Sequence, residues 1–222
     1  FTPSDAFVLG CRDGNANCPQ DNGPDFDFGA SPVLVNGADG RNFLVVGQKS
    51  GLAYGLDPDR EGATVWEYRI GQGSALGGIE WGFAVDTEKA YFANSDYLTR
   101  ESGGLAAVRL RTGELVWVAD AHEPVCEGCS PALLAAVTVI PGAVFSGAYD
   151  GLFRAYSSQD GSVLWEYDTN GSYETVNGVD GKGGSINGPG PVVVDGMVYV
   201  NSGYAAFGGR AGNVLLAFSV DE

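Results

Sequence analysis

Long apolar runs, methionine and histidine are scarce in this chain of 222 residues, and each shortage excludes something. The longest apolar stretch, residues 132–140, is interrupted by Thr138 and falls far short of the roughly 20 residues of a membrane helix. We therefore expect no membrane insertion. The single histidine, His122, leaves little imidazole acid–base equipment, which disfavours a hydrolase or lyase unless carboxylates take that part. The only methionine is Met197, so either a leader has been removed or the sequence starts inside a longer protein.

Basic residues are also few. The chain has 12 Lys and Arg against 28 Asp and Glu, which gives a formal net charge of -16. Phosphate backbones and anionic membrane surfaces would repel such a protein, so nucleic-acid and lipid partners are not expected. The same charge also serves solubility.

Cysteine occurs only as two close pairs, Cys11 with Cys18 and Cys126 with Cys129. Two local disulfides in an oxidising compartment are the economical interpretation, and they predict a periplasmic or secreted protein. The second pair is followed by Ser130, so the His of a c-type haem attachment site is missing. Three Cys and His122 would form the one conceivable zinc set, and their spacing is wrong for it. No metal site is predicted in this chain.

Glycine, by contrast, is abundant. The 35 Gly residues follow no Gly-X-Y period and only 10 Pro accompany them, which indicates many tight turns between short strands. One motif ends in Trp66, Trp117 and Trp165 at intervals of about fifty residues, in segments 55–66, 107–117 and 155–165. A glycine opens a strand upstream of each copy, and a fourth copy begins at Gly212 and stops before its turn and its Trp.

This repeat predicts an all-β protein, a β-propeller built from four-stranded W-shaped blades, with about four blades in this chain. Each Trp should stack between neighbouring blades, since it offers a large flat surface beside a glycine turn. In the third repeat we expect strands at residues 131–136, 143–149, 151–157 and 162–168. The expected organisation is a lead-in loop over residues 1–24 and blades over residues 25–70, 80–121, 130–168 and, incomplete, 189–222.

The repeat resembles the tryptophan-docking repeat of dehydrogenases that depend on pyrroloquinoline quinone (PQQ), although each copy departs from that pattern somewhere. Several longer strings sharpen the resemblance to the C-terminal half of polyvinyl-alcohol-dehydrogenase-like quinoproteins, and they span nearly the whole chain. These strings are residues 17–19, 23–32, 47–51, 77–82, 175–179, 183–186 and 201–204.

The resemblance implies an eight-bladed ring with PQQ near its axis. It implies an alcohol dehydrogenase, acting on polyvinyl alcohol or a similar alcohol by hydride transfer to the quinone, with a cytochrome as electron acceptor. It also implies calcium, with ligands expected outside this chain. The alternative is a non-catalytic propeller scaffold or binding module, because related propellers include scaffolds. Enzymatic activity is therefore expected only if the missing half of the ring is supplied.

The resemblance also carries over candidate site residues by position. Asp25 and Asp27 match the region of the catalytic Asp, although a carboxylate at this position also caps backbone amides. Lys49 matches a cation that contacts PQQ, although an edge-strand Lys is an ordinary feature. Glu80 and Trp81 lie in a Gly-rich loop that faces the cofactor in the family, where core packing of Trp81 is an equal alternative. The backbone amides of the following residues are expected either to approach PQQ carboxylates or to form a plain inter-blade turn: Gly183, Gly184 and Ser185.

A fragment of four blades would expose apolar faces that need covering. The missing half could come from another chain or be lost by proteolysis, or two copies could pair, or the four blades could close on themselves. A partner half or a second copy of the chain is ranked above self-closure, because blades shaped for an eightfold ring would have to tilt.

Overall fold

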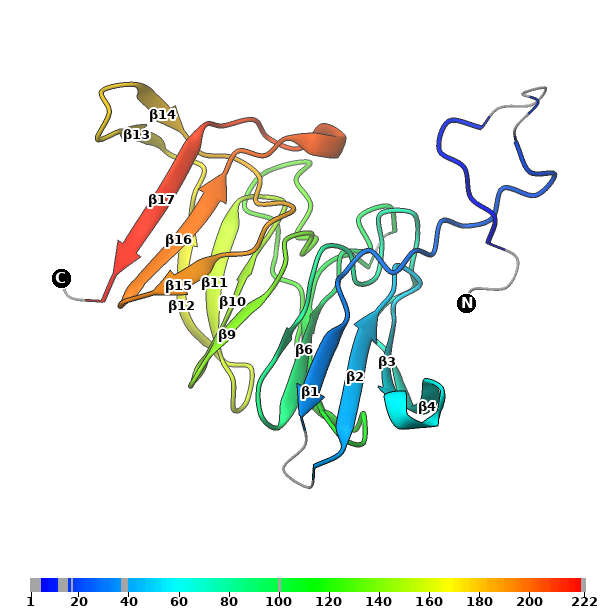
Figure 1. The fold of residues 1–222 in the computed structure, drawn as a ribbon. Coiled ribbons are helices and arrows are strands. Elements are labelled where there is room, and N and C mark those ends of the chain that lie inside the picture. The colour runs from blue at the N-terminus through cyan, green and yellow to red at the C-terminus, as the bar shows by residue number, and fades with distance from the viewer. Residues whose placement is uncertain (1–4, 12–15, 17, 37–39, 100, 221–222) are drawn as a thin grey trace.

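The computed structural model describes residues 5–11, 16, 18–36, 40–99 and 101–220. Its strands form four antiparallel sheets that stand side by side, and a small hairpin projects beyond them (Figure 1). The first sheet contains β1 (Val33–Asn36), β2 (Asn42–Gly47), β3 (Leu52–Asp57) and β4 (Ala63–Arg69). The second contains β5 (Ala84–Val85), β6 (Lys89–Ala93), β7 (Leu105–Arg109) and β8 (Leu115–Ala119).

The third sheet contains β9 (Thr138–Ile140), β10 (Ala143–Gly147), β11 (Leu152–Ser157) and β12 (Val163–Asp168). The fourth has three strands, β15 (Val192–Val194), β16 (Met197–Ser202) and β17 (Val214–Ser219). The projecting hairpin, which lies between β12 and β15 in the chain, consists of β13 (Ser172–Glu174) and β14 (Asp180–Lys182). In the described part of the chain, helical structure is limited to two short 3₁₀ turns, η1 (Pro58–Arg60) and η2 (Ala206–Gly208). That part contains no helix long and apolar enough to cross a membrane.

The predicted all-β class is confirmed, and three of the four sheets have the four strands expected of a blade. The blade boundaries stay a prediction. The first strand predicted for the third repeat is wrong. Residues 131–136 run as a buried connecting segment, and the strand that pairs with β10 is β9. Beyond one isolated bridge from Ala135 to Gly188, this segment has no ladder partner in the described chain, so its apolar residues serve packing instead of a sheet.

The hydrophobic core is divided among the gaps between successive sheets. One cluster, including Val45 and Phe92, lies between the first and second sheets. A second, including Tyr91 and Val144, lies between the second and third, and a third surrounds Phe153 between the third and fourth. Both faces of the second and third sheets are therefore covered, which is why β6, β7 and β11 are mostly buried.

The motif tryptophans join neighbouring blades, as predicted. The Trp66 indole N–H donates to the Leu110 carbonyl of the second sheet at 2.9 Å, and its ring lies against Gly113. A Cβ at residue 113 would lie 2.8 Å from the ring, so the turn admits only glycine there, and its φ of 68° is left-handed as well.

Trp165 differs from the other two motif tryptophans because the described residues place no glycine turn against it. Its side chain is 38% exposed, and its ring meets Phe218 of β17 edge-on at 5.0 Å between ring centroids. All six residues of β12 are exposed. The outer strand of the third sheet is thus open to solvent in this chain.

Candidate functional site

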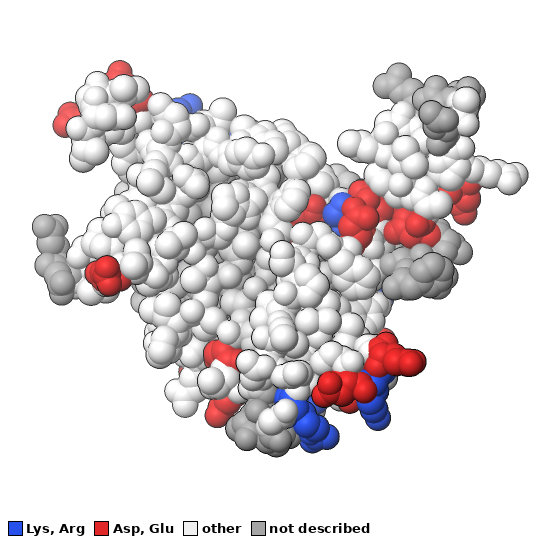
Figure 2. Space-filling model, in the orientation of Figure 1, with Lys and Arg blue, Asp and Glu red and all other residues white. Residues whose placement is uncertain are grey.

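The candidate site lies at one end of the first two sheets, where β2 runs into a tight turn over residues 48–51. Gly51 closes this turn with φ 80°, and a Cβ there would lie 2.5 Å from the carbonyl oxygen of Gly71. Lys49 is the second residue of the turn, and its N–H donates to the Asp27 carbonyl at 3.0 Å. That bond fixes the segment before β1 beside the turn after β2. Figure 2 shows basic and acidic atoms gathered where the N-terminal segment meets the sheets.

Lys49 joins the two predicted catalytic carboxylates. Its Nζ lies 3.2 Å from Asp25 Oδ2 and 3.2 Å from Asp27 Oδ2. The Lys49 and Asp25 side chains are 13% and 12% exposed, whereas the Asp27 side chain is 63% exposed. One carboxylate is therefore held inside the protein and the other stays open to solvent.

Glu80 adds a third carboxylate, and it is the most buried of the three. The residue is 4% exposed, and its Oε2 has no hydrogen-bond partner among the described residues. Burial raises the pKa of Glu80 to about 7; Lys49 opposes this shift, and the negative charges of Asp25 and Asp27 add to it. Glu80 can thus exchange a proton near neutral pH, where an ordinary glutamate cannot.

The pKa values of the other two buried members are shifted as well. Burial alone would lower the pKa of Lys49, but the charge of Glu80 and the hydrogen bonds to both aspartates outweigh it and raise that pKa. Lys49 therefore stays a cation at neutral pH. Burial raises the pKa of Asp25 despite its bond to Lys49.

The sequence reasoning missed Asn187, whose side chain accepts a hydrogen bond from Trp81. The Trp81 ring is 41% exposed, and its indole N–H donates to Asn187 Oδ1 at 2.9 Å. Because an indole nitrogen only donates, this bond assigns the amide orientation and leaves Asn187 Nδ2 as a donor. Asn187 is 2% exposed, and its Nδ2 has no partner in the part of the chain that the structure describes.

The repeat contained the signal for Asn187. Glu80 follows Ile79 and Asn187 follows Ile186, and each isoleucine N–H donates to a carbonyl just after the second strand of a sheet. Comparing the residues that follow isoleucine after the first and third blades would have found both positions. Within the described chain, both carry a buried polar atom without a partner.

The remaining predicted residues lie between the third and fourth sheets. The N–H groups of Gly183, Gly184 and Ser185 donate to Gly171 O, Ser202 Oγ and Arg210 O at 2.9, 2.8 and 2.9 Å. Among the described contacts, none links them to the Lys49 cluster. They join blades in this arrangement, and their contact with a cofactor stays a prediction.

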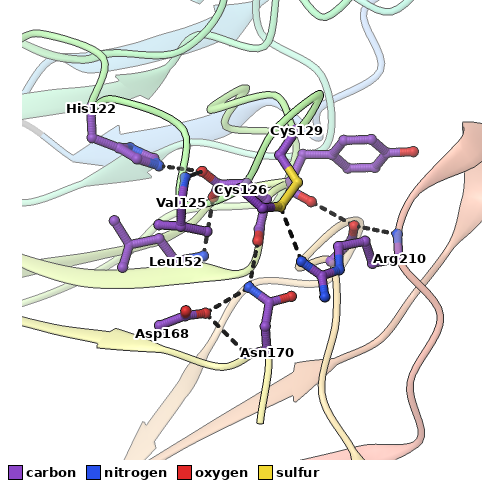
Figure 3. Close-up of a disulfide and its surroundings, with 11 residues drawn as sticks. His122, Val125, Cys126, Cys129, Leu152, Asp168, Asn170 and Arg210 are labelled. Carbon is purple, nitrogen blue, oxygen red and sulfur yellow. Dashed lines mark hydrogen bonds and ion pairs between the residues drawn. A yellow bond between two sulfur atoms is a disulfide. The ribbon is translucent and has the colours of Figure 1, made fainter.

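His122 belongs to a separate hydrogen-bonded cluster (Figure 3). Its Nε2 lies 2.8 Å from Asp150 Oδ2; that oxygen also accepts the Val125 N–H, and Asp150 Oδ1 accepts the Leu152 N–H, each at 3.1 Å. Arg210 Nη1 approaches Cys126 Sγ at 3.0 Å, so the Cys126–Cys129 loop is tied to the fourth blade. These contacts hold the loop after β8 in place.

Replacing His122 by Gln should destabilise the protein near neutral pH and do so less in strong acid. Burial alone would raise the pKa of Asp150, but the bonds from His122, Leu152 and Val125 outweigh it and lower that pKa. The stability from this carboxylate is complete above its ordinary pKa of 3.8 and is lost as pH falls through the lower folded value. Loss of one buried bond should cost about 1–3 kcal/mol at pH 7, measured by urea unfolding. A second series at about pH 2.5, below the ordinary pKa of 3.8, should show a smaller difference between variant and wild type. Equal differences at both pH values would contradict the coupling.

The two predicted disulfides are formed, Cys11–Cys18 and Cys126–Cys129. Such bonds are typical of proteins that mature in an oxidising compartment.

Comparison with known families supports the resemblance seen in the loops. The PQQ_2 family model, described as outer membrane protein assembly factor BamB, matches residues 49–182, which is more than half of the chain. The chain belongs to this family. As a PQQ_2 protein, it is also similar to two curated relatives named polyvinylalcohol dehydrogenase.

The relative from Pseudomonas sp is 47% identical over 99% of this chain, and the one from Sphingopyxis sp. (strain 113P3) is 45% identical over 98%. The chain spans 37% and 36% of their respective lengths. Among solved structures, a quinohemoprotein alcohol dehydrogenase from Pseudomonas putida HK5 superposes on 81% of this PQQ_2 chain. Its TM-score is 0.58, its identity is 19%, and 29% of that chain is covered, so it supports the fold. The predicted membership of the quinoprotein dehydrogenase group is confirmed.

Proposed function

We propose that this chain is part of a PQQ-dependent dehydrogenase that oxidises an alcohol, polyvinyl alcohol or a similar one, by hydride transfer to the quinone. The observation that carries the proposal is the cluster at Lys49, where a buried cation meets an exposed carboxylate and a glutamate that titrates near neutral pH. The two relatives that match nearly the whole chain are named polyvinylalcohol dehydrogenase.

The residues present fit the chemistry of PQQ, which is a flat, tricyclic quinone with three carboxyl groups. Lys49 supplies a cation, Trp81 an exposed aromatic face, and Asn187 Nδ2 a buried donor without a partner among the described residues. Glu80 is compatible with an anionic ligand because it is neutral below about pH 7, when it can donate a hydrogen bond.

When bound, PQQ supplies the electrophilic quinone carbonyl that takes up hydride from the alcohol carbon. The chain's own groups prepare the substrate and handle its proton. Asp27 is the carboxylate that a substrate hydroxyl reaches, since it is open to solvent and therefore suited to accept the hydroxyl proton. Lys49 holds the carboxylates of Asp25 and Asp27 in position and would supply positive charge to the quinone oxygens.

The rest of such an enzyme would come from outside this chain. The proposal includes a missing propeller half or a second copy that completes an eight-bladed ring, a cytochrome as electron acceptor, and a periplasmic location. Calcium stays a prediction with ligands outside this chain. The described residues contain no group of three or more His, Cys, Asp or Glu side chains that could hold a metal ion.

A scaffold is the second candidate, because the matching family model carries the description of an assembly factor. Titration with PQQ, followed by the quenching of Trp81 fluorescence and by quinone absorbance, separates the two. We expect saturable binding that strengthens as pH falls through about 7, since protonated Glu80 no longer repels the PQQ carboxylates.

The matched variant is Glu80→Gln, which should bind PQQ with little dependence on pH. Trp81→Phe should lose the quenching signal and keep the absorbance change. Absence of binding and of alcohol oxidation, both in this chain and in the full-length parent, would leave the scaffold as the function.

A further inference from the structure

Asp25 has a backbone that needs external support. Its φ is 66°, in the left-handed region, although it carries a side chain and is only 8% exposed. Such a conformation persists where the surroundings over-determine it, and it occurs preferentially at functional sites. The orientation of the Asp25 carboxylate toward Lys49 depends on this turn.

Asp5 provides the support. Its Oδ1 accepts the N–H of Asp25 at 3.2 Å, and its Oδ2 accepts the N–H of Phe26 at 2.5 Å. Two successive N–H groups around a left-handed residue form a concave anion-binding nest, and here the anion is a carboxylate from the same chain. Both oxygens of Asp5 are thus engaged at the turn that carries Asp25.

Gly23 also packs tightly against Asp5. Gly23 has φ 65°, and a Cβ there would lie 2.6 Å from Asp5 Oδ1 and 2.8 Å from Asp5 Cα. The segment is further held where the Val8 N–H donates to Asn22 Oδ1 at 2.8 Å. In the N-terminal lobe, described at residues 5–11, 16 and 18–24, these contacts hold Asp5 beside the turn that carries Asp25.

We propose that Asp5 is a positioning residue of the site, because its carboxylate clamps the Asp25–Phe26 turn and so sets the Asp25–Lys49–Asp27 arrangement. This inference rests on the proposed function where it concerns turnover. The clamp itself is independent of it.

The test compares Asp5→Asn, Asp5→Glu and the control Asp21→Asn. The D5N side chain offers only one acceptor oxygen. The D5E side chain keeps the charge but is one methylene longer, so its carboxylate does not fit the two amides in the same way. Asp21 lies in the same lobe, and its exposed carboxylate accepts only the Gly23 N–H at 3.3 Å in the described contacts, so D21N removes a charge without touching the clamp.

Amide hydrogen exchange is the first readout. We expect the Asp25 and Phe26 amides to exchange at least about tenfold faster in D5N and D5E, with unchanged protection in β2 and β3 and no change in D21N. Carboxyl titration by NMR is the second. The raised pKa of Asp25 should fall toward its ordinary value in D5E, where charge is conserved and only geometry is lost.

Turnover of the PQQ-loaded full-length parent, carrying the same substitutions, is the third readout. We expect kcat to fall about tenfold in D5N and D5E while KM for the alcohol stays within about twofold, because the ground-state contacts of the substrate remain. Unchanged exchange in D5N would overturn the clamp. Wild-type turnover in D5E would show that only the charge of residue 5 matters, which overturns the positioning role. Faster exchange together with normal turnover in either variant would overturn it as well. If wild type neither binds PQQ nor oxidises alcohol, the proposed function fails, and exchange and titration still decide the clamp.

Discussion

Lys49→Met, introduced into the full-length parent, should reduce kcat/KM for alcohol oxidation by about 10²–10³-fold, the range seen when one preorganised donor is removed from developing charge. Methionine keeps most of the apolar stem and deletes the cation that joins Asp25 to Asp27. Three carboxylates would then face one another without compensation. Because Lys49 lowers the pKa of Glu80, its removal should move the midpoint of PQQ binding above the wild-type value near 7.

The matched control for this prediction is Lys89→Met. Lys89 begins β6 at the opposite end of the blades and interacts with Asp86 instead of the candidate site. Steady-state kinetics and PQQ titrations over a pH range that brackets the Glu80 pKa of about 7 should show no change in this variant. If K49M retains wild-type kinetics, or if its midpoint does not rise, the assignment of Lys49 to the quinone site is wrong.

Trp117→Ala should cost about 3–5 kcal/mol of unfolding free energy, which is typical for emptying a buried aromatic site. The Trp117 indole N–H donates to the Ser158 carbonyl of the third blade at 3.2 Å. Its ring lies against Gly161, where a Cβ would be 2.6 Å away, and packs near Tyr91 at 5.9 Å between centroids. The substitution therefore leaves a cavity where the second blade packs on the third. Denaturant unfolding measures the loss of unfolding free energy.

Two further variants separate the parts of this effect. Trp117→Phe keeps an aromatic ring and loses the hydrogen bond, so it should cost about 1 kcal/mol for the bond and some packing loss. Trp165→Ala removes the same motif residue where it is partly exposed, and should cost less than about half as much as W117A. Equal losses at both positions would show that docking on the next blade is not the source of the stability.

The repeat made the blades predictable because it is local. Gly113 and Gly161 are required at turns with positive φ, and the tryptophans four residues later repeat in the same register. The strand before residue 137 was misplaced for the opposite reason. The apolar side chains of residues 131–136 are typical of a strand. Only the packing between sheets shows that these residues form a buried connecting segment.

Sequence reasoning named candidates for the site, and the structure supplied their geometry. Lys49, Asp25 and Asp27 were found by resemblance, and the structure brings them together with Glu80. Asn187 was missed because its partner, Trp81, is 106 residues away in sequence. Residues 183–185 were chosen for open backbone amides, which the neighbouring segments occupy.

The sequence by itself determined the all-β repeat, the tryptophan contacts between blades and the two disulfides, since these depend on local turns and close spacing. The tertiary structure alone decided which charges share one desolvated space. The pKa of Glu80, the buried amide donor of Asn187 and the left-handed turn at Asp25 arise from burial and from contacts between distant segments. Those quantities depend on distance and exposure, which no run of residues encodes locally.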